Sequence, residues 1–189
     1  MFRRTIAPGI EIKLLEPGDA EAVFAVADRD RAYLREWLPW MDRTHSPADV
    51  RQFIEEVVSP QWAGNRGPHC GIWVEGELVG SIGCHAIDWT NRWCSLGYWI
   101  ESRRQGQGIV TRSAAAMLNY LFDEMRLRRV VIQCGTGNHR SRAIPERLGF
   151  TQDGVMRQAQ LVGTRWLDLS TWSILEDEWR QRAEAQGLR

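Results

Sequence analysis

Apolar and polar positions recur along the chain with two different periods, and these periods predict its secondary structure. Successive side chains of a strand point to opposite faces, so a period of two predicts strands, whereas spacings of three and four predict helices. Alternating segments and buried-looking apolar runs predict strands at Ile10–Leu15, His69–Val74, Leu78–Ile87, Trp93–Ile100, Arg129–Cys134, Val155–Leu161 and Leu167–Leu175. Helical spacing and capping residues predict helices at Ala20–Asp28, Arg31–Leu38, Pro47–Val58, Ile109–Met125 and Ser141–Leu148.

The order of these elements predicts the fold class. Tight turns join the three strands between His69 and Ile100 into a meander, which requires antiparallel pairing. The helix between Trp93–Ile100 and Arg129–Cys134 permits a right-handed parallel crossover. We therefore expect an α/β (α+β) fold with a mixed, mostly antiparallel twisted sheet of about seven strands and helices on both faces. A single domain is expected to span residues 1–189.

Composition narrows the functional classes. The formal net charge is zero, so no global field attracts nucleic acid or anionic lipid, and we expect neither as a direct partner. The chain has no apolar window of about 18 residues and no signal-peptide pattern, so no membrane association is expected. The four cysteines lie far apart without C-x-x-C spacing, which favours free thiols, no metal site and a reducing cytoplasm.

Two glycines stand where a predicted strand gives way to a predicted helix. Gly106 and Gly108 directly precede the helix that begins at Ile109. A helix N-terminus has unpaired N–H groups and binds anions, and glycine allows a phosphate to approach the backbone. The preceding Arg103–Gln105 adds further donors. The junction therefore predicts a pyrophosphate cradle, with a plain glycine-rich turn as the alternative.

Two common nucleotide motifs do not fit this junction. A Walker loop needs four residues between its glycines and then a lysine, but one residue intervenes here and no lysine follows. A dinucleotide fingerprint needs a third glycine where Thr111 stands, and it follows the first strand of a βαβ unit. Both nucleotide-binding interpretations are therefore weakened, and a plain glycine-rich turn stays open as the alternative.

A second motif follows the next strand, and the two together resemble a known superfamily. Residues 137–150, GNHRSRAIPERLGF, resemble the N-x-x-S…E-x-x-G-F signature of the Gcn5-related N-acetyltransferases, and the glycine junction resembles their R/Q-x-x-G-x-G/A loop. Within this superfamily, the chain resembles the RimJ/RimL group of protein N-terminal acetyltransferases over about residues 10–180. The segments that carry this resemblance are YLREWLPWM, GELVGSIG, LGYWIE, RQGQGIV, LRRVVIQC, AIPERLGF and GVMRQAQLVGTRWLDLSTWSIL.

The resemblance implies acetyl-CoA as co-substrate. In the family, amides of the glycine-rich loop hold the pyrophosphate, and the strand before it, here Leu96–Glu101, binds the pantetheine arm. Asn138 and Ser141 match the two polar positions of the second motif near the sulfur, although a helix N-cap is the alternative for Asn138. The implied co-substrate contacts are Trp99, Ile100, Glu101, Arg103, Arg104, Gln105, Gly106, Gln107, Gly108, Ile109, Val110, Asn138 and Ser141.

The chemistry requires groups that move protons. A neutral amine attacks a thioester and a thiolate leaves, so a proton acceptor for the amine and a proton donor for the sulfur both help. Ser141 matches the family's proposed proton donor, with a simple helix cap as the alternative. The group's best-understood members carry a glutamate base in a Q-A-E stretch, but this chain has Gln160, which cannot take a proton and could instead orient a water. His85 is the substitute base, with a structural role as its alternative, and Glu101 is the second candidate.

A weak base favours an acceptor of low pKa. At pH 7 about a tenth of α-amines are neutral but only about 0.04% of lysines, a difference of about 3 kcal/mol. The preferred acceptor is therefore a protein or peptide N-terminus, and the resemblance implies a ribosomal protein. Trp37 and Trp40 are expected to form the acceptor-side wall together with Gln160, with core packing as the alternative and, for Trp37, the preferred interpretation.

Two other function classes stay open at this point. One is an acetyltransferase for a small amine, such as an antibiotic, a polyamine or an aminoacyl compound. The other is a non-catalytic acyl-CoA-binding module, which the missing glutamate permits. The resemblance also implies a homodimer.

Overall fold

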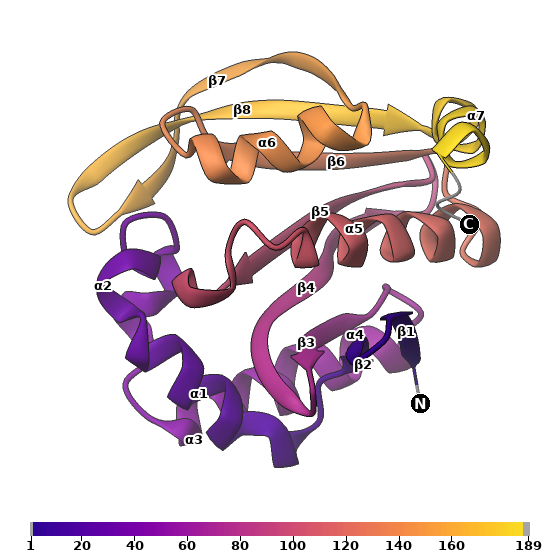
Figure 1. The fold of residues 1–189 in the computed structure, drawn as a ribbon. Helices are drawn as coiled ribbons and strands as arrows, with labels where there is room; N and C mark the ends of the chain where they lie inside the picture. Colours follow the sequence, from indigo (N-terminus) through magenta and orange to yellow (C-terminus); the bar gives the residue numbers. More distant parts are fainter. Residues whose placement is uncertain (1, 187–189) are drawn as a thin grey trace.

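A computed structural model describes residues 2–186 of the chain. These residues form an eight-stranded sheet in the order β1-β2-β3-β4-β5-β6-β8-β7 (Figure 1). Its strands are β1 (Arg3–Ala7), β2 (Ile10–Leu14), β3 (His69–Val74), β4 (Glu77–Asp88), β5 (Trp93–Ile100), β6 (Arg129–Gly135), β7 (Thr151–Val162) and β8 (Arg165–Leu175). The α-helices are α1 (Ala20–Arg29), α2 (Arg31–Leu34), α3 (Pro47–Phe53), α4 (Ser59–Ala63), α5 (Ile109–Asn119), α6 (His139–Leu148) and α7 (Glu176–Gln186). Short 3-10 or π segments are η1 (Pro17–Asp19), η2 (Pro39–Arg43), η3 (Ile54–Val58), η4 (Ser102–Arg104) and η5 (Tyr120–Glu124).

The sheet is antiparallel except between β5 and β6, which run parallel. Their pairing ends at Ser95↔Val131. Beyond it, β5 continues beside β4 as far as Ile100, and β6 continues beside β8 as far as Gly135. The mixed, mostly antiparallel sheet is thus confirmed, and it divides at its centre.

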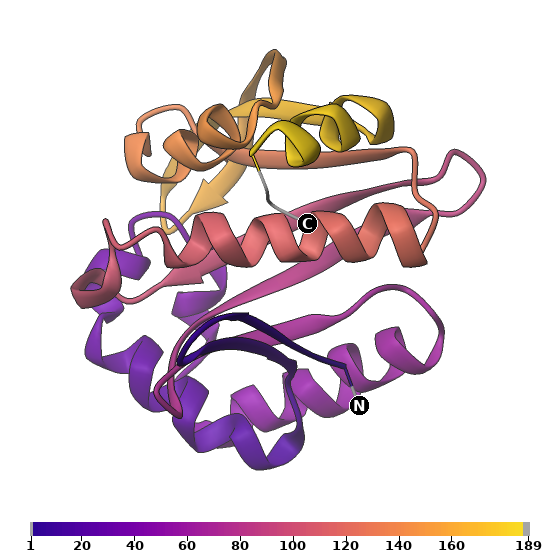
Figure 2. The ribbon, with the colours of Figure 1, turned by 45° about the vertical axis from the view of Figure 1, so that its right-hand side comes forward.

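Helices cover both faces of the sheet (Figures 1 and 2). On one face α1 packs against α3 and β4. On the other face α5 packs against β1, β2, β4, β5 and α6. The core side of α5 buries Val110, Ala114, Met117 and Leu118, which recur at the helical spacing seen in the sequence.

Prolines explain where the helical segments between α1 and β3 differ from the prediction. The helix expected over Arg31–Leu38 ends at Leu34, because Leu38 precedes Pro39 and is extended, with φ −113° and ψ 105°. The helix expected to end at Val58 instead continues through η3 into α4. Pro60 lies in the first turn of α4, where a missing backbone N–H costs little.

Two elements at the ends of the chain were not predicted. β1 has no alternating pattern and pairs with β2, which raises the strand count from the expected seven to eight within residues 2–186. α7 is polar apart from Trp179, Ala183 and Ala185, and of these Trp179 and Ala183 are buried. Trp179 Nε1 also donates to Asn119 Oδ1 at 2.8 Å. Tertiary contacts therefore stabilise these elements more than local propensity does.

Candidate active site

Two cavities meet where β5 and β6 separate. The first, which we call the inner cavity, has a volume of about 480 Å³ and extends over β4 toward α3. The second, the outer cavity, has a volume of about 920 Å³ and lies along the glycine-rich turn and α6. Residues that line both cavities mark the passage between them: Trp37, Leu38, Tyr98, Trp99, Asn138 and Ser141.

The glycine-rich turn borders the outer cavity as expected for an anion site. Gly106 and Gly108 have φ of +74° and +70°, a left-handed conformation that L side chains rarely adopt, and Gly108 is the N-cap of α5. A Cβ at Gly106 would meet no atom within 4 Å, so the surface above it is open. The first amides of α5 have no partner within the helix and point toward this opening. These residues fit a diphosphate group.

Side chains around the turn brace the turn itself. Glu101 is only 3% exposed, and its Oε2 accepts from Arg29 Nη2 at 2.7 Å and from Arg103 Nη2 at 2.9 Å. Arg104 Nε lies 3.8 Å from Glu101 Oε1. Gln107 Nε2 donates to the carbonyl oxygen of Arg103 at 3.2 Å. Backbone amides are therefore the better candidates for diphosphate donors.

Not every predicted co-substrate residue lines a cavity. The outer cavity is lined by Trp99, Ile100, Arg104, Gln105, Gly106, Gly108, Ile109, Val110, Asn138 and Ser141. In contrast, Glu101, Arg103 and Gln107 line neither cavity. This placement also separates Glu101 from the inner cavity, so it is a poor candidate for a base. Gln105 Oε1 accepts from Arg140 Nη1 at 2.6 Å.

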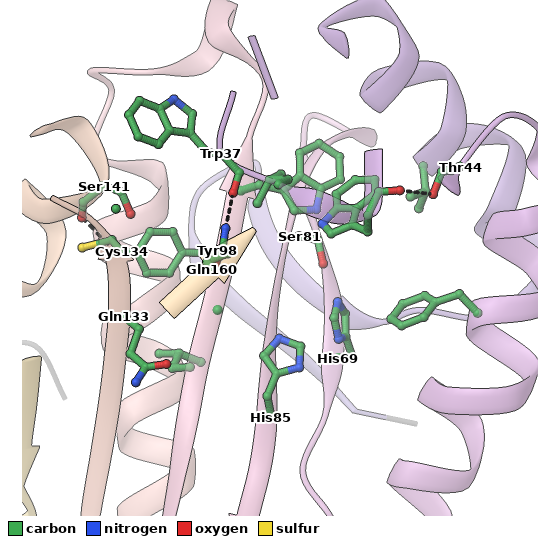
Figure 3. A pocket seen from close by; sticks show the side chains of 18 of the residues that line it. Trp37, Thr44, His69, Ser81, His85, Tyr98, Gln133, Cys134, Ser141 and Gln160 are labelled. Carbon is green, nitrogen blue, oxygen red and sulfur yellow. Dashed lines mark hydrogen bonds between the residues drawn. The ribbon is translucent and has the colours of Figure 1, made fainter. Parts of the chain in front are cut away.

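The N-terminus of α6 positions Asn138 and Ser141. Asn138 is the N-cap of this helix, and its Oδ1 accepts from the backbone N–H of Ser141 at 3.1 Å. Ser141 lies inside the first turn, so its own hydroxyl is not the cap of α6. Tyr98 Oη donates to the carbonyl oxygen of Ser141 at 3.0 Å (Figure 3). This contact fixes the first turn of α6 against β5.

Neighbouring Cys134 is unlike a reactive cysteine. It is buried on β6, and burial raises the pKa of its thiol. Its Sγ lies 3.4 Å from Ser170 Oγ. A thiol held protonated is a poor nucleophile.

Glycines on three neighbouring strands make room for rings on the floor of the inner cavity. A Cβ at Gly83 would lie 2.6 Å from the His69 ring, and one at Gly97 would lie 3.0 Å from His85 Nε2. A Cβ at Gly135 would similarly lie 3.0 Å from the Trp37 ring. Each glycine thus allows a ring to lie against the sheet, and this requirement was not recognised from the sequence.

The two histidines form one aromatic group with Phe53. The His69 and His85 ring centroids are 5.4 Å apart in an edge-to-face arrangement (Figure 3). The Phe53 ring also packs edge-to-face on His69, with ring centroids 5.3 Å apart. Burial, and secondarily the neighbouring His85, lowers the pKa of His69 to about 3. Burial also lowers the pKa of His85, whose exposed surface opens into the cavity that it lines. Both imidazoles are therefore neutral at pH 7.

The predicted acceptor wall borders the inner cavity. Trp37 and Trp40 both line it, and both are only partly buried, which argues against the core-packing interpretation of Trp37. Trp40 also packs against Trp99, with ring centroids 5.9 Å apart. Gln160 ends a bulge of β7 and pairs with Leu167, and its Nε2 donates to the carbonyl oxygen of Trp37 at 2.7 Å. The amide thereby joins two walls of the cavity.

The comparisons with known proteins agree with this arrangement. Residues 10–151 match the family described as an acetyltransferase (GNAT) domain. The chain belongs to the GNAT acetyltransferase family. YdaF of Bacillus subtilis, whose name suggests a ribosomal N-acetyltransferase, is 35% identical over 95% of this chain and 98% of its own length. The ribosomal-protein-serine acetyltransferase of Escherichia coli is 24% identical over 91% and 96% of the two chains.

Solved structures show the same fold. The crystal structure of an acetyltransferase that is 35% identical superposes with a TM-score of 0.89 and covers 94% of this chain and 99% of that one. RimL, a ribosomal L7/L12 α-N-protein acetyltransferase in complex with coenzyme A, gives a TM-score of 0.86 at 24% identity and covers 90% and 96%. This GNAT protein is therefore an acetyl-CoA-dependent N-acetyltransferase.

Other classes of site find no support in the described part of the chain. Within residues 2–186, no three histidine, cysteine or acidic side chains come together as metal ligands. None of the helices in that range combines the length and apolarity needed to cross a membrane.

Proposed function

We propose that this GNAT acetyltransferase acetylates the N-terminal α-amine of a protein, as the description of RimL, an α-N-protein acetyltransferase, suggests for that enzyme. One observation carries the proposal: the inner cavity offers only weak proton acceptors. Gln160 is an amide, and Asp49 is the single carboxylate among the described lining residues. Asp49 Oδ2 already accepts from the backbone N–H groups of His45 and Ser46, each at 2.8 Å, and these bonds lower its pKa.

A weakly assisted site suits an amine that is partly neutral at pH 7. An α-amine has a pKa of about 8 and a lysine of about 10.4, so the α-amine needs about 3 kcal/mol less to lose its proton. His85 would accept the proton of the attacking amine, since its neutral imidazole faces the inner cavity. Its lowered pKa makes it a mild base, sufficient for an α-amine more readily than for a lysine.

The other roles follow from position. Acetyl-CoA supplies an acetyl group activated as a thioester. The turn amides from Gly106 to Val110 would hold its diphosphate, and the edge of β5 at Trp99 and Ile100 would hold the pantetheine arm. Ser141, at the passage between the cavities, would give a proton to the sulfur, while Trp37 and Trp40 confine the acceptor.

A peptide that carries a free N-terminus and an internal lysine tests the acceptor class. Mass spectrometry of the product should find acetyl on the α-amine in large excess over the lysine side chain. Acetylation mainly on the lysine would contradict the proposal. Turnover of polyamines or aminoacyl compounds, with neither peptide amine modified, would instead favour a small-molecule acceptor.

We also propose that the enzyme is a cytoplasmic homodimer. β7 is an edge strand with little cover, and its Val155 and Met156 are 49% and 41% exposed. Long exposed edge strands with apolar side chains are usually covered in functional proteins. The four cysteines are free and buried, as suits a reducing compartment. Sedimentation velocity should give a dimer mass, and Met156→Lys should shift it toward the monomer; a monomeric wild type would contradict this arrangement.

A further inference from the structure

His69 places a polar ring on the floor of the inner cavity. Within residues 2–186, neither of its ring nitrogens bonds to another side chain or to the backbone, although the surrounding chain desolvates the ring. The ring borders the inner cavity, packs edge-to-face against both Phe53 and His85, and lies against Gly83. The His69 side chain is partly exposed, so its ring nitrogens can form hydrogen bonds with a ligand in the inner cavity.

The two histidines lie at different depths of the inner cavity. His85 lies against Gly97 of β5, beside the opening through which the acetyl group must reach the acceptor. His69 lies one strand farther away, on β3, and its nearest ring neighbour toward β5 is His85. An amine held at His85 would therefore project its substituent over β4 toward His69.

We propose that His69 determines specificity by hydrogen-bonding an uncharged polar group, such as a hydroxyl, on the first residue of the acceptor. This inference rests on the proposed α-amine acceptor and adds which first residue is preferred. It assigns the reacting amine to His85 and the first side chain to His69.

The surroundings of His69 favour this class of group. A neutral imidazole has one N–H donor and one acceptor nitrogen, which matches a hydroxyl that both donates and accepts. A neutral imidazole offers no charge to a cationic or anionic first side chain, so it gives neither of them a charge-assisted hydrogen bond. An apolar side chain would fill the space but leave the imidazole unpaired.

Threonine and valine have the same shape and differ in the hydroxyl, so paired peptides isolate the effect. With acetyl-CoA saturating, wild-type kcat/KM should be about 5- to 100-fold higher for a peptide that begins with Thr than for its Val counterpart. His69→Phe keeps a ring above Gly83 but removes both nitrogens, so it should bring the ratio close to one by lowering activity on the Thr peptide. His69→Asn, which keeps a donor and an acceptor, should retain part of the preference.

His45→Phe is the matched control, since His45 is exposed and lines neither cavity. It should keep the wild-type ratio. Equal acetylation of both peptides by the wild type would overturn the role of His69, and this comparison needs no variant to fold. A preference that persists in His69→Phe would overturn it as well. Acetylation of neither peptide on its α-amine, with acetyl-CoA still bound, would instead refute the proposed acceptor.

Discussion

Gln160 Nε2 donates a hydrogen bond of 2.7 Å to the carbonyl oxygen of Trp37, two residues that lie 123 positions apart in the chain. The bond joins β7 to the segment between α2 and η2. Arg165 Nη2 adds a second link to this segment, a 3.0 Å bond to the carbonyl oxygen of Glu36. Because Trp37 borders both cavities, these links hold the wall between the co-substrate side and the acceptor side.

We therefore expect Gln160→Glu to weaken acceptor binding. A carboxylate has no N–H to donate, so it would face the Trp37 carbonyl with lone pairs and leave that oxygen unpaired. Such a loss costs about 1–3 kcal/mol, which predicts a rise of about 5- to 150-fold in the acceptor KM. Acetyl-CoA binding, measured by calorimetry, should change little.

Gln158→Glu is the control for this substitution. It introduces the same charge in the same bulge, where the side chain of Gln158 is exposed. Its steady-state kinetics should match those of the wild type. If Gln160→Glu instead gained activity on lysine, the carboxylate would be acting as a base and the link to Trp37 would matter less than its geometry indicates.

The order of strands and the two motif-bearing turns could be predicted because their signals are local. Period-two alternation identified the meander, and the glycines before Ile109 identified the turn at the N-terminus of α5. The RimJ/RimL-like segments identified the family. These patterns depend on residues that are neighbours in the chain or on one element.

Other parts of the site depend on pairings that no local pattern reveals. The sequence shows His69 and Gly83 as separate residues, and only the register of β3 against β4 places the imidazole above the glycine. In the sequence, Glu101 stands only two residues before Arg103 and next to the glycine-rich turn. Its ion-pair partner Arg29 comes from the distant α1, which no local pattern indicates. A histidine opposite a glycine in a predicted hairpin was the one signal that could have located the floor of the inner cavity.

The glycine turn should be intolerant of a negative side chain. Gly108→Asp would place a β-substituent on a residue with φ +70° and a carboxylate beside the proposed diphosphate position. Calorimetry should show coenzyme A affinity reduced by at least about tenfold, since both strain and like charge oppose binding. Gly18→Asp adds the same charge in open space, and coenzyme A should bind it as it binds the wild type. If Gly108→Asp bound coenzyme A as tightly as the wild type, the glycine-rich turn would not be the diphosphate-binding site.

Neutralising Glu101 should loosen the turn without touching either cavity. Glu101→Gln leaves Arg29, Arg103 and Arg104 without the buried carboxylate that they share. Because the three guanidinium groups are partly exposed, water can hydrate them, which reduces the loss of folding stability. We expect a loss of about 1–3 kcal/mol in the free energy of unfolding and a higher KM for acetyl-CoA. Glu77→Gln is the control, because Glu77 is 76% exposed and also pairs with Arg104. Equal effects of the two substitutions in urea titrations would contradict the bracing role.

Ser141 should affect turnover more than binding. Because Asn138 caps α6, Ser141→Ala keeps the backbone N–H bond to Asn138 and should leave the helix intact. Loss of a proton donor to the sulfur predicts a fall in kcat of about 100-fold, the lower end of the usual range for general acid–base assistance. Ser59→Ala, at an exposed position on α4, is the control. If Ser141→Ala kept the wild-type kcat, Ser141 would not be the proton donor, and the site would act only by positioning the two substrates.

Stability should fall on mild acidification, and His69 should account for much of the fall. The unfolded chain takes up a proton at His69 below a pKa of about 6.5, whereas the folded protein does so only near a pKa of about 3. The native state therefore binds fewer protons between these values, so the free energy of unfolding decreases as the pH falls from 6.5 toward 3. At pH 5 the contribution of His69 is a loss of about 2 kcal/mol, from about 1.5 pH units at 1.36 kcal/mol each. Urea titrations at pH 7.5 and pH 5 should show that this part of the loss is missing in His69→Phe and retained in His45→Phe. An equal acid sensitivity in wild type and His69→Phe would mean that the imidazole of His69 is hydrated in the folded protein and not held neutral by burial.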